Sequence, residues 1–109
     1  MSNQTVIKNV AAFFDGDIGL FEVCTEQRED AWLVIQAILR HDLTDDQMSV
    51  LAAGPLETLL SWHGAALIER VEEEARRNPK FNDLLGGVWR GAMPDEIWER
   101  VERARKAAW

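Results

Sequence analysis

Apolar side chains recur at the spacing of an α-helix along most of this 109-residue chain, and that periodicity limits the possible folds more than any other feature. The clearest stripe is Phe81, Leu84, Leu85, Val88 and Trp89, at positions i, i+3, i+4, i+7 and i+8. The β-branched run 31–39 would also suit a buried strand, but no second strand candidate exists to pair with it. We therefore predict an all-α fold, a single domain over 1–109 built as a compact bundle of about six or seven short helices.

The helix expected over 30–40 should lie near the centre of this bundle. Its run 31–39 contains one polar residue, Gln36, which leaves too little polar surface for a side that faces solvent. The segments 55–62 and 80–89 share a hydrophobic layout and each follows a longer predicted helix. Stacked helix pairs, as in a short α-solenoid, are therefore an alternative arrangement for the middle of the chain.

Gly54-Pro55 is the strongest interruption of the helical pattern. Glycine can adopt the left-handed conformation that ends a helix, and proline suits the first position of the next one. We therefore expect an elbow there, with two helices meeting at an angle. His63-Gly64 predicts a second helix end, with Gly64 at the C′ position and the His63 ring beside the negative end of the helix.

Helix starts are expected at residues whose side chains accept hydrogen bonds from a first helical turn. These residues are Thr5, Asp17, Thr44 with Gln47 as a capping box, and Asn78 before Pro79. Asp15-Gly16 should end the first helix. The residues expected to face the core from the first two helices are Val6, Ile7, Val10, Phe13, Phe14, Ile18, Leu20, Phe21 and Cys24.

Negative charge is concentrated in the first half of the chain. The net charge is -7, of which residues 1–50 carry -6, with nine acids against three bases. This balance argues against direct nucleic-acid binding, which needs Lys and Arg gathered to neutralise phosphates. It has two readings: a solvated surface that keeps a small protein soluble, or a docking face for a basic protein partner.

The docking hypothesis assigns the partner-binding residues to the acids of the first half: Asp15, Asp17, Glu22, Glu26, Asp42, Asp45 and Asp46. A face of this kind would speed association with a positively charged protein. By analogy, the function predicted first is that of a non-catalytic inhibitor or immunity-type protein, which occludes a basic surface on a nucleic-acid-handling partner.

The alternative hypothesis is a small enzyme or ligand-binding domain with a pocket near Trp62, His63 and Trp89. No catalytic residue is assigned, because Ser61 and His63 at i and i+2 point to different helix faces. No metal site is predicted either, since the two histidines and the single Cys24 follow no ligand spacing. The sequence indicates no cofactor.

The N-terminal segment lacks the basic stretch and continuous apolar run of a signal peptide, and no run of eighteen apolar residues occurs. Together with a lone cysteine that cannot form an internal disulfide, this favours a cytoplasmic protein with no membrane contact. A homo-oligomer is a third hypothesis, because five Trp are many for this length and Trp109 could be a contact residue.

The motifs AAGPLE (52–57), HG (63–64) and LLGGVW (84–89) resemble, in order and spacing, a family of small bacterial proteins of unknown function. The similar stretch runs from about residue 31 through MPDEIW (93–98), whereas residues 1–28 match poorly. These are packing and turn residues rather than reactive groups. The resemblance therefore implies an all-helical fold and a bacterial or phage origin, without an activity or functional residues.

Overall fold

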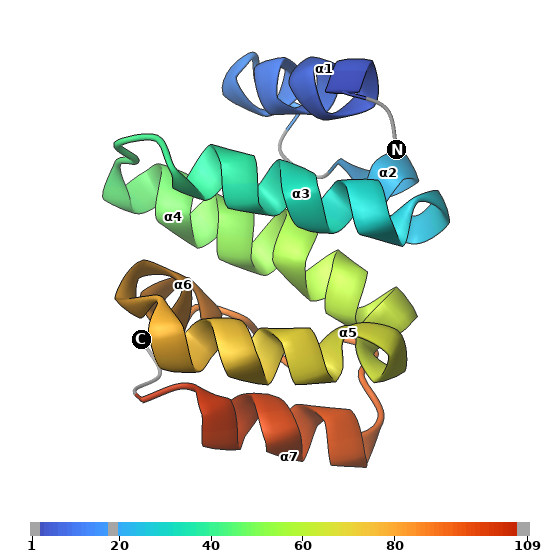
Figure 1. The fold of residues 1–109 in the computed structure, drawn as a ribbon, viewed down its shortest axis with the longest axis vertical. Helices are drawn as coiled ribbons and strands as arrows, with labels where there is room; N and C mark the ends of the chain where they lie inside the picture. The colour runs from blue at the N-terminus through green and yellow to red at the C-terminus, as the bar shows by residue number, and fades with distance from the viewer. Residues whose placement is uncertain (1–2, 18–19, 107–109) are drawn as a thin grey trace.

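The computed structural model describes residues 3–17 and 20–106, and every regular element among them is helical (Figure 1). The elements are α1 (Asn3–Phe14), α2 (Phe21–Glu26), α3 (Arg28–Leu39), α4 (Asp45–Leu51), the π-helical segment η1 (Ala52–Leu56), α5 (Glu57–Arg77), α6 (Pro79–Leu85) and α7 (Asp95–Ala104). The Cα radius of gyration, 12.6 Å, is that of a compact domain of this length. The prediction of a compact all-α fold is confirmed.

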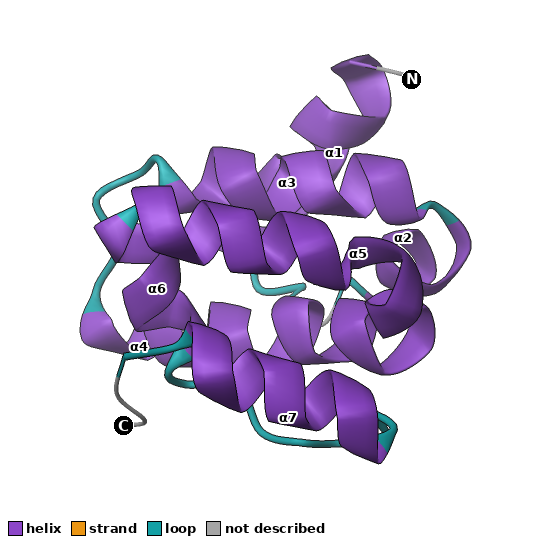
Figure 2. Cartoon of the chain, turned by 60° about the horizontal axis from the view of Figure 1, so that its bottom comes forward, coloured by secondary structure: helices purple, strands orange, loops and turns teal. Residues whose placement is uncertain are grey.

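The helices are stacked along the longest axis of the molecule, with α1 at one end and α7 at the other (Figure 1). Figure 2 shows the same separation from a second direction, with α3 and α5 between them. The buried core runs through these middle layers, and its largest fully buried side chains include Ile35, Ile38, Leu56, Leu59 and Leu60. Helix α3 packs against α1, α2 and α5, which places it near the centre as expected.

The predicted elbow at Gly54-Pro55 is wrong, because the chain stays helical through this point, from Asp45 to Trp62. Pro55 lies inside η1 and is buried, and Gly54 does not have a positive φ. Proline has no N–H to donate and its ring crowds the carbonyl of the preceding turn, so a regular α-helix would be strained here. The wider π turn accommodates the ring while the helix continues.

The sharp bend lies instead within α5, at His63, whose φ of -133° and ψ of 22° are not helical. In Figure 1 the chain reverses direction there, at the change from yellow-green to yellow. Gly64 does not take the predicted left-handed conformation. It is buried against α7, and a Cβ at this position would lie 2.7 Å from Cγ2 of Ile97. The glycine is therefore needed for a close helix contact rather than for a helix end.

Two of the predicted helix starts are confirmed. Thr44 and Gln47 form a reciprocal capping box, with the Gln47 N–H donating to Thr44 Oγ1 at 3.1 Å and the Thr44 N–H donating to Gln47 Oε1 at 2.9 Å. The Asn78 side chain accepts hydrogen bonds from the backbone of Lys80 and Phe81 at the start of α6. Both caps satisfy donors that a first helical turn leaves unpaired.

The start of the chain differs more from expectation. Helix α1 begins at Asn3, so Thr5 lies inside it, and it ends at the Gly16 turn, where φ is 108°. Helix α2 begins at Phe21 rather than after Asp17, because the buried Leu20 takes a left-handed conformation immediately before it. Ile18 lies outside the described residues. Ile7 and Phe14 are exposed rather than core-facing, and only Phe13 of the first predicted stripe is fully buried.

A bidentate ion pair joins the second half of α5 to α7. Arg100 donates from Nε and Nη2 to the Glu72 carboxylate at 2.8 and 2.6 Å. These hydrogen bonds hold the pKa of Glu72 below its usual range. The pair therefore supports the same contact that Gly64 and Ile97 make.

We expect Gly64→Ala to destabilise the protein by about 1 kcal/mol or more, since overpacking against Ile97 outweighs the gain in helix propensity. Urea denaturation would measure the change. In an Ile97→Ala background, the same glycine substitution should cost little, because the clashing methyl group has been removed. Equal costs in both backgrounds would show that the close approach of α5 and α7 does not require glycine.

Candidate protein-binding surface

All seven acidic residues predicted to bind a partner are exposed: Asp15, Asp17, Glu22, Glu26, Asp42, Asp45 and Asp46. Within the described residues, none of them forms an ion pair. Other carboxylates are neutralised locally, for example Glu29 by Arg70 and Glu72 by Arg100. The charge of these seven acids is therefore not neutralised by an ion pair within the described residues.

Three of these acids lie at one end of the molecule. The Phe14 ring, at the end of α1, packs on the His41 ring with centroids 4.9 Å apart, and Asp15 and Asp42 are the residues that follow these two rings in the chain. Asp46 lines a hollow of about 220 Å³ with Phe14 and the adjoining Gly16 turn. We call Asp15, Asp42 and Asp46 the acidic end.

A second group of acids lies on or near α2, which also carries one of two exposed aromatic rings that pack together. Phe21 of α2 and Trp62 of α5 are 61% and 59% exposed, and their rings meet at 90° with centroids 5.9 Å apart. We call these two residues the aromatic pair. Glu22 and Glu26 lie on the same short helix as Phe21, and Glu22 lines a hollow of about 250 Å³ with Asp17. Large exposed aromatic rings beside carboxylates are a typical composition for a protein interface.

The seventh acid is placed apart from these groups. Asp45 lines a hollow of about 390 Å³ together with Met48, Ser49 and Asp83. The predicted docking face is thus divided, with the acidic end around α1 and the start of α4, and the aromatic pair with its acids around α2.

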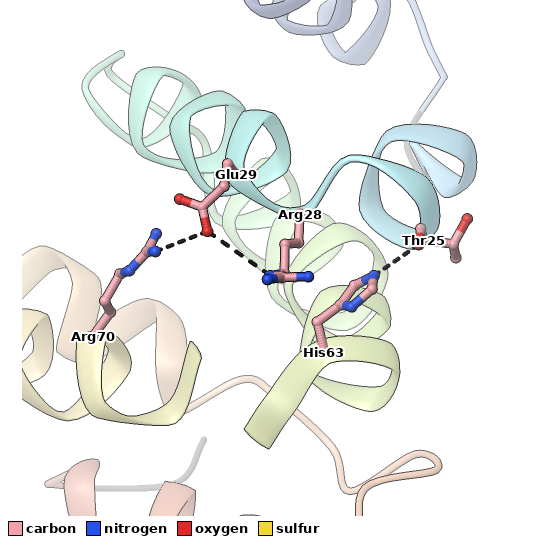
Figure 3. A network of polar contacts seen from close by, with 5 residues as sticks. All are labelled: Thr25, Arg28, Glu29, His63 and Arg70. Carbon is pink, nitrogen blue, oxygen red and sulfur yellow. Dashed lines mark hydrogen bonds and ion pairs between the residues drawn. The ribbon is translucent and has the colours of Figure 1, made fainter. Parts of the chain in front are cut away.

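His63 joins α2 to the bend of α5. Its Nε2 lies 2.7 Å from the carbonyl oxygen of Thr25, in the last turn of α2 (Figure 3). A donor at this position satisfies a carbonyl that the end of a helix leaves unpaired. Beside it, the Glu29 carboxylate accepts a hydrogen bond from Arg70 at 2.8 Å, which holds the pKa of Glu29 below its usual range. The His63 contact holds α2, and with it the aromatic pair, against α5, whereas the Glu29 and Arg70 pair joins α3 to the same helix.

The structure does not bring Trp62, His63 and Trp89 into one pocket. Trp62 and His63 border α2, whereas Trp89 lines a hollow of about 430 Å³ against α7 with Trp98 and Arg105. Trp109 lies outside the described residues.

The nucleophilic side chains near these residues have structural contacts. Ser61 Oγ accepts a hydrogen bond from the backbone N–H of Ala92 at 3.2 Å. Cys24 is buried, and this burial raises the pKa of its thiol to about 12. Within residues 3–17 and 20–106, no three His, Cys, Asp or Glu side chains are grouped as metal ligands would be.

The comparison with protein families gives a match over most of the chain. The model described as "Family of unknown function (DUF6869)" matches residues 16–109. The chain belongs to this family. The resemblance to a family of unknown function is therefore confirmed, and the match includes residues 16–28, which we expected to fit poorly. Of the helices, only α1 lies outside it.

Searches of curated proteins and of solved structures found no match to this member of the family. In the part of the chain that the structure describes, none of the helices combines the length and apolar character needed to cross a bilayer.

Sequence periodicity missed the exposure of Phe21 and Trp89, since both fall on predicted apolar stripes. In α2, the left-handed Leu20 shifts the helix start, so Val23 and Cys24 are buried and Phe21 points outward. Trp89 is exposed because α6 ends at Leu85, before the apolar stripe predicted over 81–89 is complete. The Gly86-Gly87 pair was the available signal for that early end.

The His63→Ala substitution should lower the free energy of unfolding by about 1–2 kcal/mol, because the Thr25 carbonyl loses its partner and α2 loses a contact with α5. Urea denaturation followed by circular dichroism would measure this. Glu69→Gln, an exposed change on the same helix, serves as the control. If His63→Ala left stability unchanged, the imidazole would be free to act on a ligand, as the alternative hypothesis requires.

Cys24 should resist thiol reagents in the folded protein at pH 8, since a pKa of about 12 leaves almost no thiolate and the side chain is buried. Absorbance after addition of 5,5′-dithiobis(2-nitrobenzoate) would show slow labelling that becomes fast in urea. Rapid labelling without denaturant would contradict both the burial and the raised pKa.

Proposed function

We propose that this protein is a non-catalytic binding module that docks onto a basic surface of a partner protein. The observation that carries the proposal is the exposure of seven acids that have no ion pair within the described residues, three of them grouped with a protruding aromatic pair around α2. Carboxylates at the rim of an interface accelerate encounter with a positively charged partner. Aromatic side chains provide the buried contact area that slows dissociation.

The contacts of α2 support this assignment. An interface anchor works best when its side chains are held in place before binding, because less conformational freedom is then lost. The edge-to-face packing of Phe21 on Trp62 and the bond from His63 to Thr25 hold the aromatic pair in this way. The reactive side chains Ser61 and Cys24 are engaged or buried, which favours binding over catalysis.

The partner class follows from charge. Proteins that handle nucleic acids present clustered Lys and Arg for phosphate contacts, and an acidic module can occupy such a surface. An inhibitor or immunity-type role against a bacterial nucleic-acid-handling protein, in a reducing cytoplasm, is the form of this function that we propose. Its support is the charge distribution and the unpaired Cys24, together with the resemblance to small bacterial proteins.

The acidic end should control the rate of partner capture. A partner would first be identified by cross-linking to the wild-type protein in the native host, and its association measured by stopped-flow fluorescence. We expect Asp15→Lys, Asp42→Lys and Asp46→Lys together to slow association about tenfold or more at low salt, because electrostatic steering is reversed. The difference should shrink at high salt, where charges are screened.

Glu73→Lys, Glu99→Lys and Glu102→Lys together are the matched control, since these exposed acids give the same charge change on α5 and α7. Phe21→Ala with Trp62→Ala should raise the dissociation rate rather than slow association. Circular dichroism would establish that each variant is folded. Unchanged association of the acidic-end variant at low salt, or equal slowing by the control, would reject the proposed surface.

A further inference from the structure

The hollow of about 430 Å³ that Trp89 lines lies between the segment after α6 and the end of α7. Two tryptophans and two arginines line it: Trp89 and Arg90 from the segment, Trp98 from α7, and Arg105 directly after α7. Gly86-Gly87 forms part of its wall. This volume is within the range of small-molecule sites. Because α7 is at the opposite end of the molecule from α1, the hollow is separate from the acidic end (Figure 1).

Arg105 is held in position at this hollow. Its guanidinium carbon lies 5.0 Å from the centroid of the Trp98 ring, and Nη1 donates to the carbonyl of Val88 at 3.1 Å. The other N–H groups of its guanidinium have no partner among the described residues, and Arg105 forms no ion pair there. Arg90, by contrast, is paired with Asp95 and donates from Nε to the Met93 carbonyl. Arg105 is therefore the cation with donors left for an anion.

Trp89 supplies an aromatic surface beside this cation. Its side chain is 74% exposed, and its ring packs on no other ring in the described part of the chain. An indole in water offers a face on which a planar ring can stack. A positioned guanidinium offers paired donors to a phosphate or a carboxylate.

We propose that the hollow lined by Trp89, Trp98 and Arg105 is a binding site for a small ligand that carries both a planar aromatic ring and an anionic group. The ring stacks on Trp89 and the anion is bound by Arg105. The charge of this hollow is opposite to that of the protein as a whole, so an anion is attracted here despite the net charge of -7. The proposal does not depend on the protein-binding function.

The indole N–H signals in a ¹H–¹⁵N NMR spectrum test the site directly. Adenosine monophosphate and indole-3-acetate combine a ring with a phosphate or a carboxylate, whereas adenosine and inorganic phosphate each supply one part. We expect at least one two-part ligand to shift the Trp89 and Trp98 signals saturably at millimolar concentration, and each single part to bind about tenfold more weakly. A response to only one two-part ligand would show which of the two combinations of ring and anion the hollow accepts.

Trp89→Ala and Arg105→Gln should each weaken binding about tenfold, read from the remaining Trp98 signal. Ile7→Ala and Arg103→Gln are the controls, since both residues are exposed and lie outside the lining of the hollow. Trp89→Ala removes an exposed ring, so it tests the site even if Arg105→Gln loosens the end of α7. Two results would overturn the proposal: no saturable shift with either two-part ligand, or equal binding by Trp89→Ala and wild type.

Discussion

The bend of α5 at His63, and the close contact of Gly64 with Ile97 that follows it, determine how the two ends of this molecule are arranged. Before the bend, α4, η1 and the start of α5 form a continuous helical segment that carries Trp62 towards α2. After it, the rest of α5 packs on α7. The two candidate surfaces are therefore built on opposite sides of one bend, and each depends on its contacts.

Two kinds of interaction hold the bend. On the side of α2, the His63 ring binds the Thr25 carbonyl, so a polar contact fixes a short helix that could not be stable alone. On the side of α7, the contact of Gly64 and Ile97 is apolar and is extended by the Glu72 and Arg100 pair. The charges differ in the same way: Asp95 of α7 and Glu72 of α5 form ion pairs, whereas the seven acids of the predicted docking face form none within the described residues.

Much of the helical pattern follows from sequence. The caps at Thr44 and Asn78 were predicted because a side-chain acceptor next to a first turn acts locally, without reference to the rest of the fold. The π turn at Pro55 was not predictable in this way. Its ring is buried among core residues, and tertiary packing favoured a continuous helix over the break that Gly54-Pro55 prefers locally.

The candidate site was predictable in composition but not in arrangement. Charge counting identified the acids, since exposed carboxylates follow from solvation alone. It could not show that the consecutive residues Asp45 and Asp46 would line different hollows, or that His41 would pack on Phe14 at the end of α1, because these depend on where separate helices meet. The exposed positions of Phe21 and Trp89 depend on where α2 begins and α6 ends, the least reliable features of periodicity.

The separation of the two surfaces explains how an acidic protein can keep a cationic hollow. The molecule is 33 Å long, and α1 and α7 lie at opposite ends of that axis (Figure 1). At physiological ionic strength, exposed charges are screened over about 8 Å, so acids at one end contribute little to the potential at the other. The potential at Arg105 is set by its neighbours, and within the described residues its guanidinium contacts an aromatic ring and a carbonyl rather than a carboxylate. Net charge thus governs long-range encounter with a protein partner, while local composition governs which small ligand the hollow would select.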